Sequence, residues 1–424
     1  MELQEFKRDL LNSIFAANKH TANLSVLFQA FTQVLGELTG IETEFDMNDW
    51  SNVNTEFGVA ISPVQAAKCT QEQLRSLVFM QGVKAAIEDK LNQGLPEVRI
   101  LYAGTGPYAT LLVPLLAMLP DLPVRATLLD IHKENVSAVQ QLIDKLDVAH
   151  CVEEVVCTDA LKWQPKDADK FDIIISETMT ALLKREPQVW IFKHLFPYLQ
   201  EDGVLIPESI ALFATLKRSD AEVQVGEFFN LQRTTVKKLS EGDSSVLTGT
   251  LTIPEEYEPG DGFKLNTHIT VYKEHMLGEH ESSLNVPFTI PCEATNLSVG
   301  AEVKYQYCNN SSPEFIFDFP KPPKFIQTQQ IAPLDEKSAL GLVGLLSMFQ
   351  HSQLKKHRKS IEMPEAVWVC LQTLCDELNI SLQNYLATLY QSASIDTLEA
   401  WLVTQDTRLN NADFINDLNA KLLK

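Results

Sequence analysis

The sequence predicts an α/β protein in which a parallel sheet is followed by an antiparallel β domain, with helical regions at both ends of the chain. Residues from about 211 to 317 alternate between apolar and polar side chains, as antiparallel strands do. Helical spacing of apolar residues marks the first 96 residues and returns after about residue 335. Between them, short apolar runs alternate with helical stretches, which indicates βαβ crossovers and a parallel sheet. The runs lie at residues 98–103, 126–129, 154–157, 171–175 and 204–206.

A chain of 424 residues is longer than one hydrophobic core usually organises, so we expect several packed units. Two helices are expected in the first 45 or so residues, and a third begins near residue 71 and ends near residue 94. The predicted units are an N-terminal helical region, a Rossmann-like domain, an antiparallel β domain and a C-terminal helical domain. Their expected bounds are residues 1–96, 97–209, 210–330 and 331–424.

The composition narrows the classes of partner. A formal net charge of -21 repels nucleic acid, which binds to clustered Lys and Arg, and favours cationic partners. The one dense basic run, at residues 351–359, is read as a solvated helix face, with an acidic partner as the alternative.

The compartment is predicted to be the cytoplasm. The start of the chain has acids where a signal peptide needs a basic region and an apolar core. The longest apolar run, at 109–119, is interrupted by Pro114 and falls short of the roughly 20 residues that span a bilayer, so no membrane segment is expected. The seven cysteines are scattered without a paired zinc pattern and fit a reducing compartment. They are Cys69, Cys151, Cys157, Cys292, Cys308, Cys370 and Cys375.

Two further chemistries are set aside. His268, His275 and His280 have no zinc-ligand spacing, so no metal site is expected. Cys157 ends a strand that we expect to be buried, and is therefore interpreted as a packing residue rather than a nucleophile.

A nucleotide-binding turn is predicted at Gly104, Thr105 and Gly106, between a strand and an expected helix. Missing side chains there let a ligand approach the backbone, and helix amides would point at it. Asp130 ends the next strand, about 24 residues beyond Gly106, where an acid can accept ribose hydroxyls. Asp159 follows the third strand, where a carboxylate can take the amine of an adenine. Either acid can instead be a helix N-cap.

Two glutamates frame the segment after the fourth strand. Residues 176–186 read Ser-Glu-Thr-Met-Thr-Ala-Leu-Leu-Lys-Arg-Glu, which places Glu177 at one end and Glu186 at the other. Paired carboxylates can orient a guanidinium through charge-assisted hydrogen bonds, and that positioning lowers a reaction barrier. The two can also differ in protonation if they lie close together. The alternative for Glu186 is an acid at a helix N-terminus before Pro187.

Together these residues resemble the class I S-adenosylmethionine-dependent methyltransferases, and more closely their protein arginine methyltransferase branch, over roughly residues 70–215. Residues 176–186 are similar to that branch's Ser-Glu-x-Met-Gly-x-x-Leu-x-x-Glu loop. Residues 75–83, which begin with Arg75, are similar to its Arg-Thr-x-x-Tyr-x-x-Ala-Ile helix, which caps the cofactor. The resemblance implies a Rossmann-like methyltransferase sheet with S-adenosyl-L-methionine bound across it.

The resemblance also implies roles for residues. Arg75 would hold the methionine carboxylate, with a solvent-facing arginine as the alternative, and an Arg can clamp a carboxylate with two hydrogen bonds. Glu177 and Glu186 would be the catalytic clamp, with Glu177 also beside the cofactor. Family members commonly form head-to-tail dimers, so a homodimer is expected.

This sequence departs from the family pattern at four places. Tyr102 replaces the acid before the first glycine, and Tyr108 replaces the third glycine. Thr180 replaces the glycine of the double-glutamate loop, which is expected to narrow the pocket or change which substrate enters. Only Thr267 and His268 remain of the family's Thr-His-Trp motif.

The predicted activity is methyl transfer to a nitrogen of a guanidino or other cationic group, on a protein or on a small molecule. One alternative is a methyltransferase for hydroxyl or carboxyl acceptors. A second, motivated by Tyr102, is a non-catalytic binding or scaffold protein on the same fold.

Overall fold

A computed structural model describes most of the chain. The described residues are 3–43, 51–166, 170–218, 221–258, 260–290, 295, 297–319, 342, 345, 365–392 and 395–422.

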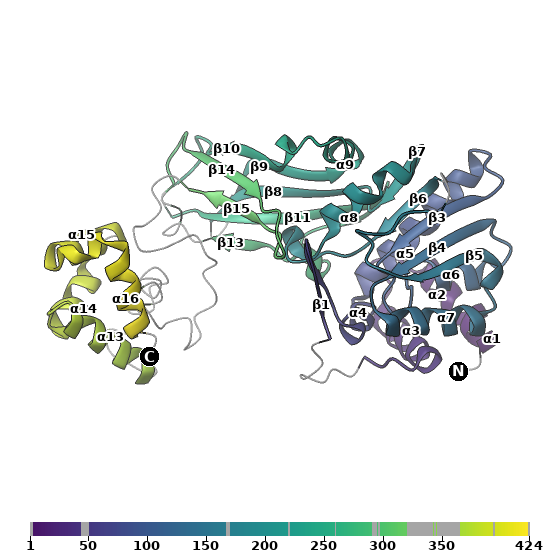
Figure 1. Ribbon diagram of the computed structural model, residues 1–424, viewed down its shortest axis with the longest axis horizontal. Coiled ribbons are helices and arrows are strands. Elements are labelled where there is room, and N and C mark those ends of the chain that lie inside the picture. The colour runs from purple at the N-terminus through teal and green to yellow at the C-terminus, as the bar shows by residue number, and fades with distance from the viewer. Residues whose placement is uncertain are drawn as a thin grey trace.

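The chain begins with helices that pack beside the parallel sheet (Figure 1). The first predicted helix is α1, a π-helical turn and α2 in succession, and the second is α3. After a short hairpin and α4, the long helix α5 leads into the sheet. The bounds are α1 Leu3–Glu5, the π turn Phe6–Leu10, α2 Leu11–Ala16, α3 Leu24–Thr39, β1 Val53–Thr55, β2 Gly58–Ala60, α4 Pro63–Cys69 and α5 Gln73–Asn92.

The centre is a five-stranded sheet in which every neighbouring pair is parallel, in the order β5-β4-β3-β6-β7. The chain runs outward from β3 through β4 and β5, then returns to place β6 on the other side of β3. Loops that follow β3, β4 and β6 therefore meet at one edge, where ligands bind in such sheets. The strands are β3 Val98–Ala103, β4 Val124–Asp130, β5 Val152–Cys157, β6 Phe171–Ser176 and β7 Leu199–Ile206, with α6 Val113–Met118, α7 Lys133–Leu146 and α8 Gln188–Leu195 between them.

Two expectations about this sheet are wrong. No helix opens at the glycine turn: α6 begins only at Val113, because Pro114 suits the first turn of a helix, and turns fill the residues before it. Cys157 is exposed rather than buried, because β5 is the edge strand and its burial pattern is mostly partial.

Antiparallel strands follow the parallel sheet, as predicted (Figure 1). One sheet has the order β12-β11-β8-β9 with β13 paired to β11, and another has the order β10-β14-β15. Their bounds are β8 Ser209–Lys217, β9 Glu222–Gln232, β10 Thr248–Thr252, β11 Gly262–Tyr272, β12 His275–Leu277, β13 Phe288–Ile290, β14 Glu302–Tyr307 and β15 Phe315–Asp318, with helix α9 at Arg233–Ser240.

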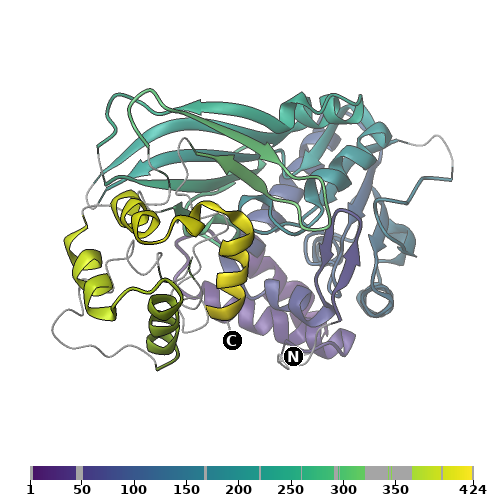
Figure 2. The same ribbon diagram turned by 60° about the vertical axis from the view of Figure 1, so that its left-hand side comes forward.

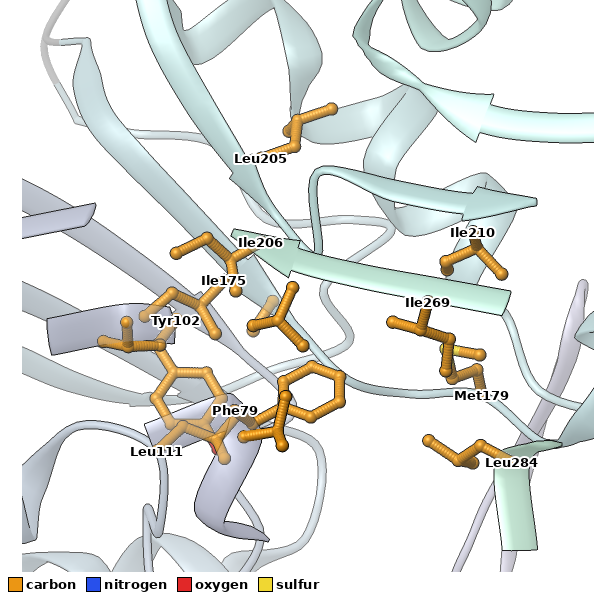
Figure 3. Packing of buried hydrophobic residues seen from close by; sticks show 14 of the residues in the cluster. Phe79, Tyr102, Leu111, Ile175, Met179, Leu205, Ile206, Ile210, Ile269 and Leu284 are labelled. Carbon is orange, nitrogen blue, oxygen red and sulfur yellow. The ribbon is translucent and has the colours of Figure 1, made fainter. Parts of the chain in front are cut away.

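One hydrophobic core joins the two sheets. Figure 3 shows Phe79 of α5 and Ile175 of β6 on one side, and Ile210 and Ile269 of the β domain on the other, within a single cluster. Helix α5 lies so close to β11 that a Cβ at Gly82 would come within 2.5 Å of a Val271 methyl carbon. The β domain is therefore built onto the same helix that carries Arg75.

The C-terminal helices have a core of their own (Figure 1 and Figure 2). Helical spacing predicted after residue 335 is borne out by Val367, Leu371, Leu374 and Leu378, which are all buried in this core. Of residues 340–349 only 342 and 345 are described, and the basic run and Cys292 lie outside the described residues. The helices are α13 Glu365–Glu377, α14 Leu382–Gln391, α15 Ile395–Gln405 and α16 Ala412–Leu422.

Short 3-10 turns connect several of these elements. The parallel sheet followed by antiparallel strands confirms the predicted fold class. Among the described residues, no helix is long and apolar enough to cross a membrane. The turns are Ala149–Cys151, Ala181–Leu183, Phe196–Tyr198, Ser245–Leu247, Ser283–Asn285 and Thr407–Asn410.

Candidate functional site

A pocket of about 1050 Å³, including its open mouth, lies where the carboxyl ends of β3, β4 and β6 meet. Its walls contain all of the residues that the sequence assigned to the cofactor or to the catalytic clamp. What each of them binds stays a prediction. These residues are Arg75, Gly104, Thr105, Gly106, Asp130, Asp159, Glu177 and Glu186.

The glycine turn has a backbone that requires glycine. Gly104 and Gly106 have φ of 77° and 61°, in the left-handed region. A Cβ on Gly104 would collide with the side chain of Thr178. The backbone N–H of Gly106 donates to Oδ2 of Asp130 over 2.9 Å, so the turn and the acid at the end of β4 form one unit.

Asp130 is already well supplied with donors. Its Oδ1 accepts from the backbone of His132 (2.9 Å) and from Nδ2 of Asn135 (3.0 Å). Its Oδ2 accepts from Gly106 and, at 3.5 Å, from the Thr105 hydroxyl. A carboxylate has about four acceptor positions. The Thr105 hydroxyl lies closer to the Gly106 carbonyl, at 3.0 Å, so when it donates there the Oδ2 side has room for a further donor. Burial raises the pKa of Asp130, and these hydrogen bonds oppose that rise.

Two residues that sequence reasoning missed lie beside Asp130 in the pocket wall. Nε2 of His132 and Oδ1 of Asn135 are buried without a hydrogen-bond partner in the described part of the chain, and both residues line the pocket. Buried polar atoms normally have partners, so these two are candidates to bind a ligand. Their position at the start of α7, directly after the strand-end acid, was the available signal.

Asp159 caps a turn rather than a helix, so its helix N-cap alternative is wrong, and its binding of an adenine stays a prediction. Its Oδ1 accepts from the backbone N–H of Leu161 over 3.0 Å, as a capping residue does, and Lys162 lies 3.6 Å from its Oδ2. It lines the pocket nonetheless. The cap fixes the carboxylate at the pocket wall without filling its acceptor positions.

Arg75 is buried, so the solvent-facing alternative is wrong. Its Nη2 donates to both carboxylate oxygens of Glu177 at 2.6 and 2.7 Å, and its Nη1 donates to Glu72 at 2.8 Å. Glu72 also accepts from the backbone and the hydroxyl of Ser283 in the β domain, at 2.7 and 2.8 Å. Burial opposes the charge of Arg75, but the charges of Glu177 and Glu72 outweigh it and hold the pKa well above its usual value.

The two glutamates have different surroundings. Glu177 is ion-paired with Arg75, which counters the rise in pKa caused by burial. No ion pair reaches Glu186 from any described residue, and it is 8% exposed. Burial and then the charge of Glu177 raise the pKa of Glu186 to about 8. Glu186 does precede α8, yet it also lines the pocket, so the helix-terminus alternative does not remove it from the site.

The β1–β2 hairpin forms a wall of the pocket. The sequence analysis did not predict this hairpin. Thr55, Val59 and Ala60 line the pocket, and the backbone N–H of Val59 donates to the carbonyl of Arg185 over 2.8 Å. A Cβ on Gly58 would lie 2.7 Å from that carbonyl oxygen. The signal was the alternation around a glycine in this short segment.

The four departures from the family pattern have local explanations. Tyr102 is buried in the pocket wall, and Tyr108 donates a 2.5 Å hydrogen bond to the carbonyl of Ile41 just beyond α3. Thr180 is not among the pocket-lining residues, and its hydroxyl bonds the carbonyl of Lys184 at 2.5 Å. The expected narrowing by Thr180 is therefore wrong.

Thr267 and His268, the two residues left of the Thr-His-Trp motif, lie on opposite faces of β11. Thr267 is buried and its hydroxyl accepts from the backbone N–H of Leu182 over 3.0 Å, within the double-glutamate loop. His268 points to the exposed face and packs on Phe213. Among the described residues no group of three His, Cys, Asp or Glu side chains is arranged to hold a metal.

Comparison with known proteins adds little. No family model matches the sequence, and no curated protein matches it. One similar solved structure is the Trypanosoma brucei PRMT1 enzyme-prozyme heterotetrameric complex with AdoHcy. The similarity covers 60% of this chain and 92% of that chain, with 11% identity and a TM-score of 0.40. A likeness of this extent carries no argument about what this chain binds or does.

Proposed function

We propose that this chain is an S-adenosylmethionine-dependent N-methyltransferase whose acceptor is a guanidino or other cationic nitrogen. The observation that carries the proposal is the pairing, in one pocket, of two different walls. One wall has the glycine turn and the acids Asp130 and Asp159, and the other has Glu177 and Glu186. Nucleoside-binding groups thus lie beside carboxyl groups suited to a cation.

The residues present fit this cofactor. The pocket, about 1050 Å³ with its open mouth, is lined by groups that a nucleoside cofactor and an acceptor cation can use. Asp130, His132 and Asn135 offer one open carboxylate position and two unpartnered polar atoms for the ribose. Arg75 uses at most three of its five N–H donors on Glu177 and Glu72, which leaves donors for the methionine carboxylate. When bound, S-adenosylmethionine supplies a methyl group on a positively charged sulfur.

Glu177 and Glu186 would orient the acceptor. The ion pair with Arg75 favours the ionised form of Glu177, whereas Glu186, with a pKa of about 8, is largely protonated at neutral pH before a cation enters. A cation next to Glu186 favours the ionised form and lowers that pKa, so the acceptor displaces the proton and becomes paired. Methylation of a guanidinium nitrogen releases one proton from that nitrogen. A carboxylate oxygen of Glu186 is the group positioned to accept it.

Ligand binding gives the first test. Titration calorimetry with S-adenosylhomocysteine should show binding to the full chain, and Asp130→Asn should weaken it at least about tenfold. Glu255→Gln, an exposed site in the β domain, serves as the control and should bind as the unchanged chain does. Absence of binding at millimolar ligand would contradict the proposal as a whole.

Methyl transfer gives the second test. Labelled S-adenosylmethionine should transfer label to at least one of free arginine, arginine-containing peptides and a panel of small guanidino and amino compounds. Glu186→Gln should lower kcat/KM for that acceptor at least about a hundredfold, because a neutral amide cannot accept a proton. Labelling of hydroxyl or carboxyl compounds alone would overturn the cationic acceptor. Turnover that persists in both Glu177→Gln and Glu186→Gln would overturn the clamp.

A further inference from the structure

The backbone between the two glutamates is held in an unusual conformation. Leu182, Leu183 and Arg185 have φ of 60°, 55° and 64°, so three non-glycine residues within four positions are left-handed. Leucine has no polar side chain to favour this conformation locally. Such residues persist only where surrounding contacts fix them.

The contacts that fix this segment come from the β domain. Each of the three left-handed residues has a backbone group bonded to a different part of that domain. The bonds are Leu182 N–H to Thr267 Oγ1 at 3.0 Å, the Tyr307 hydroxyl to the Leu183 carbonyl at 2.9 Å, and Arg185 N–H to the Pro313 carbonyl at 2.8 Å.

Tyr307 of β14 is the most firmly placed of these partners. Its side chain is 2% exposed, and its ring lies 4.8 Å from that of Phe315 and is stacked at 6.4 Å on that of Phe229. Burial raises the pKa of the phenol well above its usual value, so the hydroxyl stays a donor. A ring held on several sides cannot follow a moving loop, and its hydroxyl is therefore a fixed point.

The same ring contacts the chain on both sides of Glu186. The hydroxyl binds Leu183, three residues before Glu186, and the ring lies 6.3 Å from that of Trp190, four residues after it. Trp190 belongs to α8, which begins directly after Glu186 and Pro187. Tyr307 thus spans the segment that places Glu186 in the pocket wall.

We propose that Tyr307 is a positioning residue for the acceptor side of the pocket: its hydroxyl keeps Leu182, Leu183 and Arg185 left-handed, and that conformation sets where the Glu186 carboxyl lies. The kinetic part of this inference rests on the proposed methyltransferase function. The conformational part does not, because it concerns the backbone of the chain itself.

Tyr307→Phe is the direct variant, since it removes one oxygen and keeps the ring. Tyr305→Phe is the matched control, because Tyr305 lies two residues earlier on β14 and packs in the same aromatic cluster. No hydrogen bond of the Tyr305 hydroxyl to residues 177–186 is among those found between described residues. The two variants therefore differ in whether the loop loses a donor.

Amide hydrogen exchange measured by mass spectrometry on the full chain tests the conformational part. The amides of Leu182, Leu183, Arg185 and Glu186 are all hydrogen-bonded. Tyr307→Phe should speed exchange in peptides covering residues 180–187 by about tenfold, the equivalent of one lost hydrogen bond, and Tyr305→Phe should not. Equal exchange in the two variants would overturn the inference. So would faster exchange spread over the whole chain, since Tyr307 would then be an ordinary core residue.

Kinetics and ligand binding complete the test. Tyr307→Phe should lower kcat/KM for the acceptor about tenfold while the affinity for S-adenosylhomocysteine changes less than about twofold. The limb of the pH profile that reports Glu186 should move to lower pH, because a displaced carboxyl is less buried. If Tyr307→Phe speeds exchange in the loop but the unchanged chain transfers no methyl group, the proposed function is contradicted. The conformational part of the inference is then still supported. An unshifted limb with unchanged kcat/KM would overturn the positioning role.

Discussion

The two walls of the pocket are held in different ways. Asp130, on the nucleoside wall, is bonded by Gly106, His132 and Asn135, of which the last two are its near neighbours in the chain. The acceptor wall, residues 177–186, is held by residues distant in the sequence: Arg75, the β1–β2 hairpin and the β domain. The first wall is a local property of β3 and β4, and the second exists only once the β domain has packed.

Arg75 is buried in the pocket wall and bonded to Glu177 and Glu72, and its loss should have the largest effect. Arg75→Met leaves the buried Glu177 without its ion pair, at a cost of about 3–5 kcal/mol in the free energy of unfolding. The pKa of Glu177 should rise further, so the variant should lose stability as pH rises above the ordinary glutamate value of 4.5. Urea unfolding measures both.

The double variant Arg75→Met with Glu177→Gln tests the cause. Removing the unpaired charge should recover part of the lost stability, because the amide has no charge to bury. No recovery would mean that Arg75 stabilises the fold by packing rather than through Glu177.

Glu186 should make the stability of the acceptor wall depend on pH. Its pKa of about 8 in the folded chain lies above the ordinary value of 4.5. The protonated carboxyl therefore contributes stability that is fully present below about pH 4.5 and is lost as pH rises through about 8. Glu186→Gln should remove this dependence, so that the variant exceeds the unchanged chain in stability by about 4 kcal/mol at pH 8, and by far less at pH 4.5. If the free energy of unfolding of Glu186→Gln and of the unchanged chain changes with pH in the same way, Glu186 does not have the raised pKa.

Gly58 tests the hairpin's part in the acceptor wall. Gly58→Ala places a Cβ 2.7 Å from the Arg185 carbonyl at φ 142°, which should cost about 1–3 kcal/mol and weaken acceptor binding. Affinity for S-adenosylhomocysteine should change little. Gly40→Ala is the control, since it has φ 73° with nothing within 4 Å of the added carbon. If the KM for the acceptor is the same in Gly58→Ala and Gly40→Ala, the hairpin does not position residues 177–186.

The smallest effect is expected on the nucleoside wall. His132→Phe keeps a ring but removes Nε2, and should weaken adenosine binding about fivefold, as one neutral hydrogen bond would. Calorimetry with adenosine, 2′-deoxyadenosine and 3′-deoxyadenosine identifies the partner. The variant should lose no further affinity for the analogue that lacks the hydroxyl bound by His132. Equal losses for all three nucleosides would remove His132 from ribose recognition.

The nucleoside wall was predictable because its signals are local. A glycine turn after a strand, and acids at the ends of the next strands, follow from strand alternation and from the common edge of a parallel sheet. Gly104, Asp130 and Asp159 therefore fall where they were expected. The same local logic failed at α6 and Cys157, where Pro114 and the edge position of β5 decided the outcome.

For the acceptor wall, the sequence predicted which residues belong to the site but not what they contact. The spacing of Glu177 and Glu186 marked them, but nothing nearby in the sequence indicated that Arg75 would pair with one of them and burial would protonate the other. Thr180 illustrates the limit: its place in the motif suggested a pocket residue, whereas its hydroxyl bonds the loop's own backbone.

The sequence by itself determined the order of the sheets and the identity of the polar residues at one sheet edge, because periodicity and strand-end chemistry are encoded in neighbouring positions. Only the tertiary structure decided the left-handed backbone between the glutamates, the raised pKa of Glu186 and the hydrogen bond from Tyr307 to the Leu183 carbonyl. These depend on desolvation and on hydrogen bonds between segments more than a hundred residues apart, and such contacts leave no periodic trace in the chain.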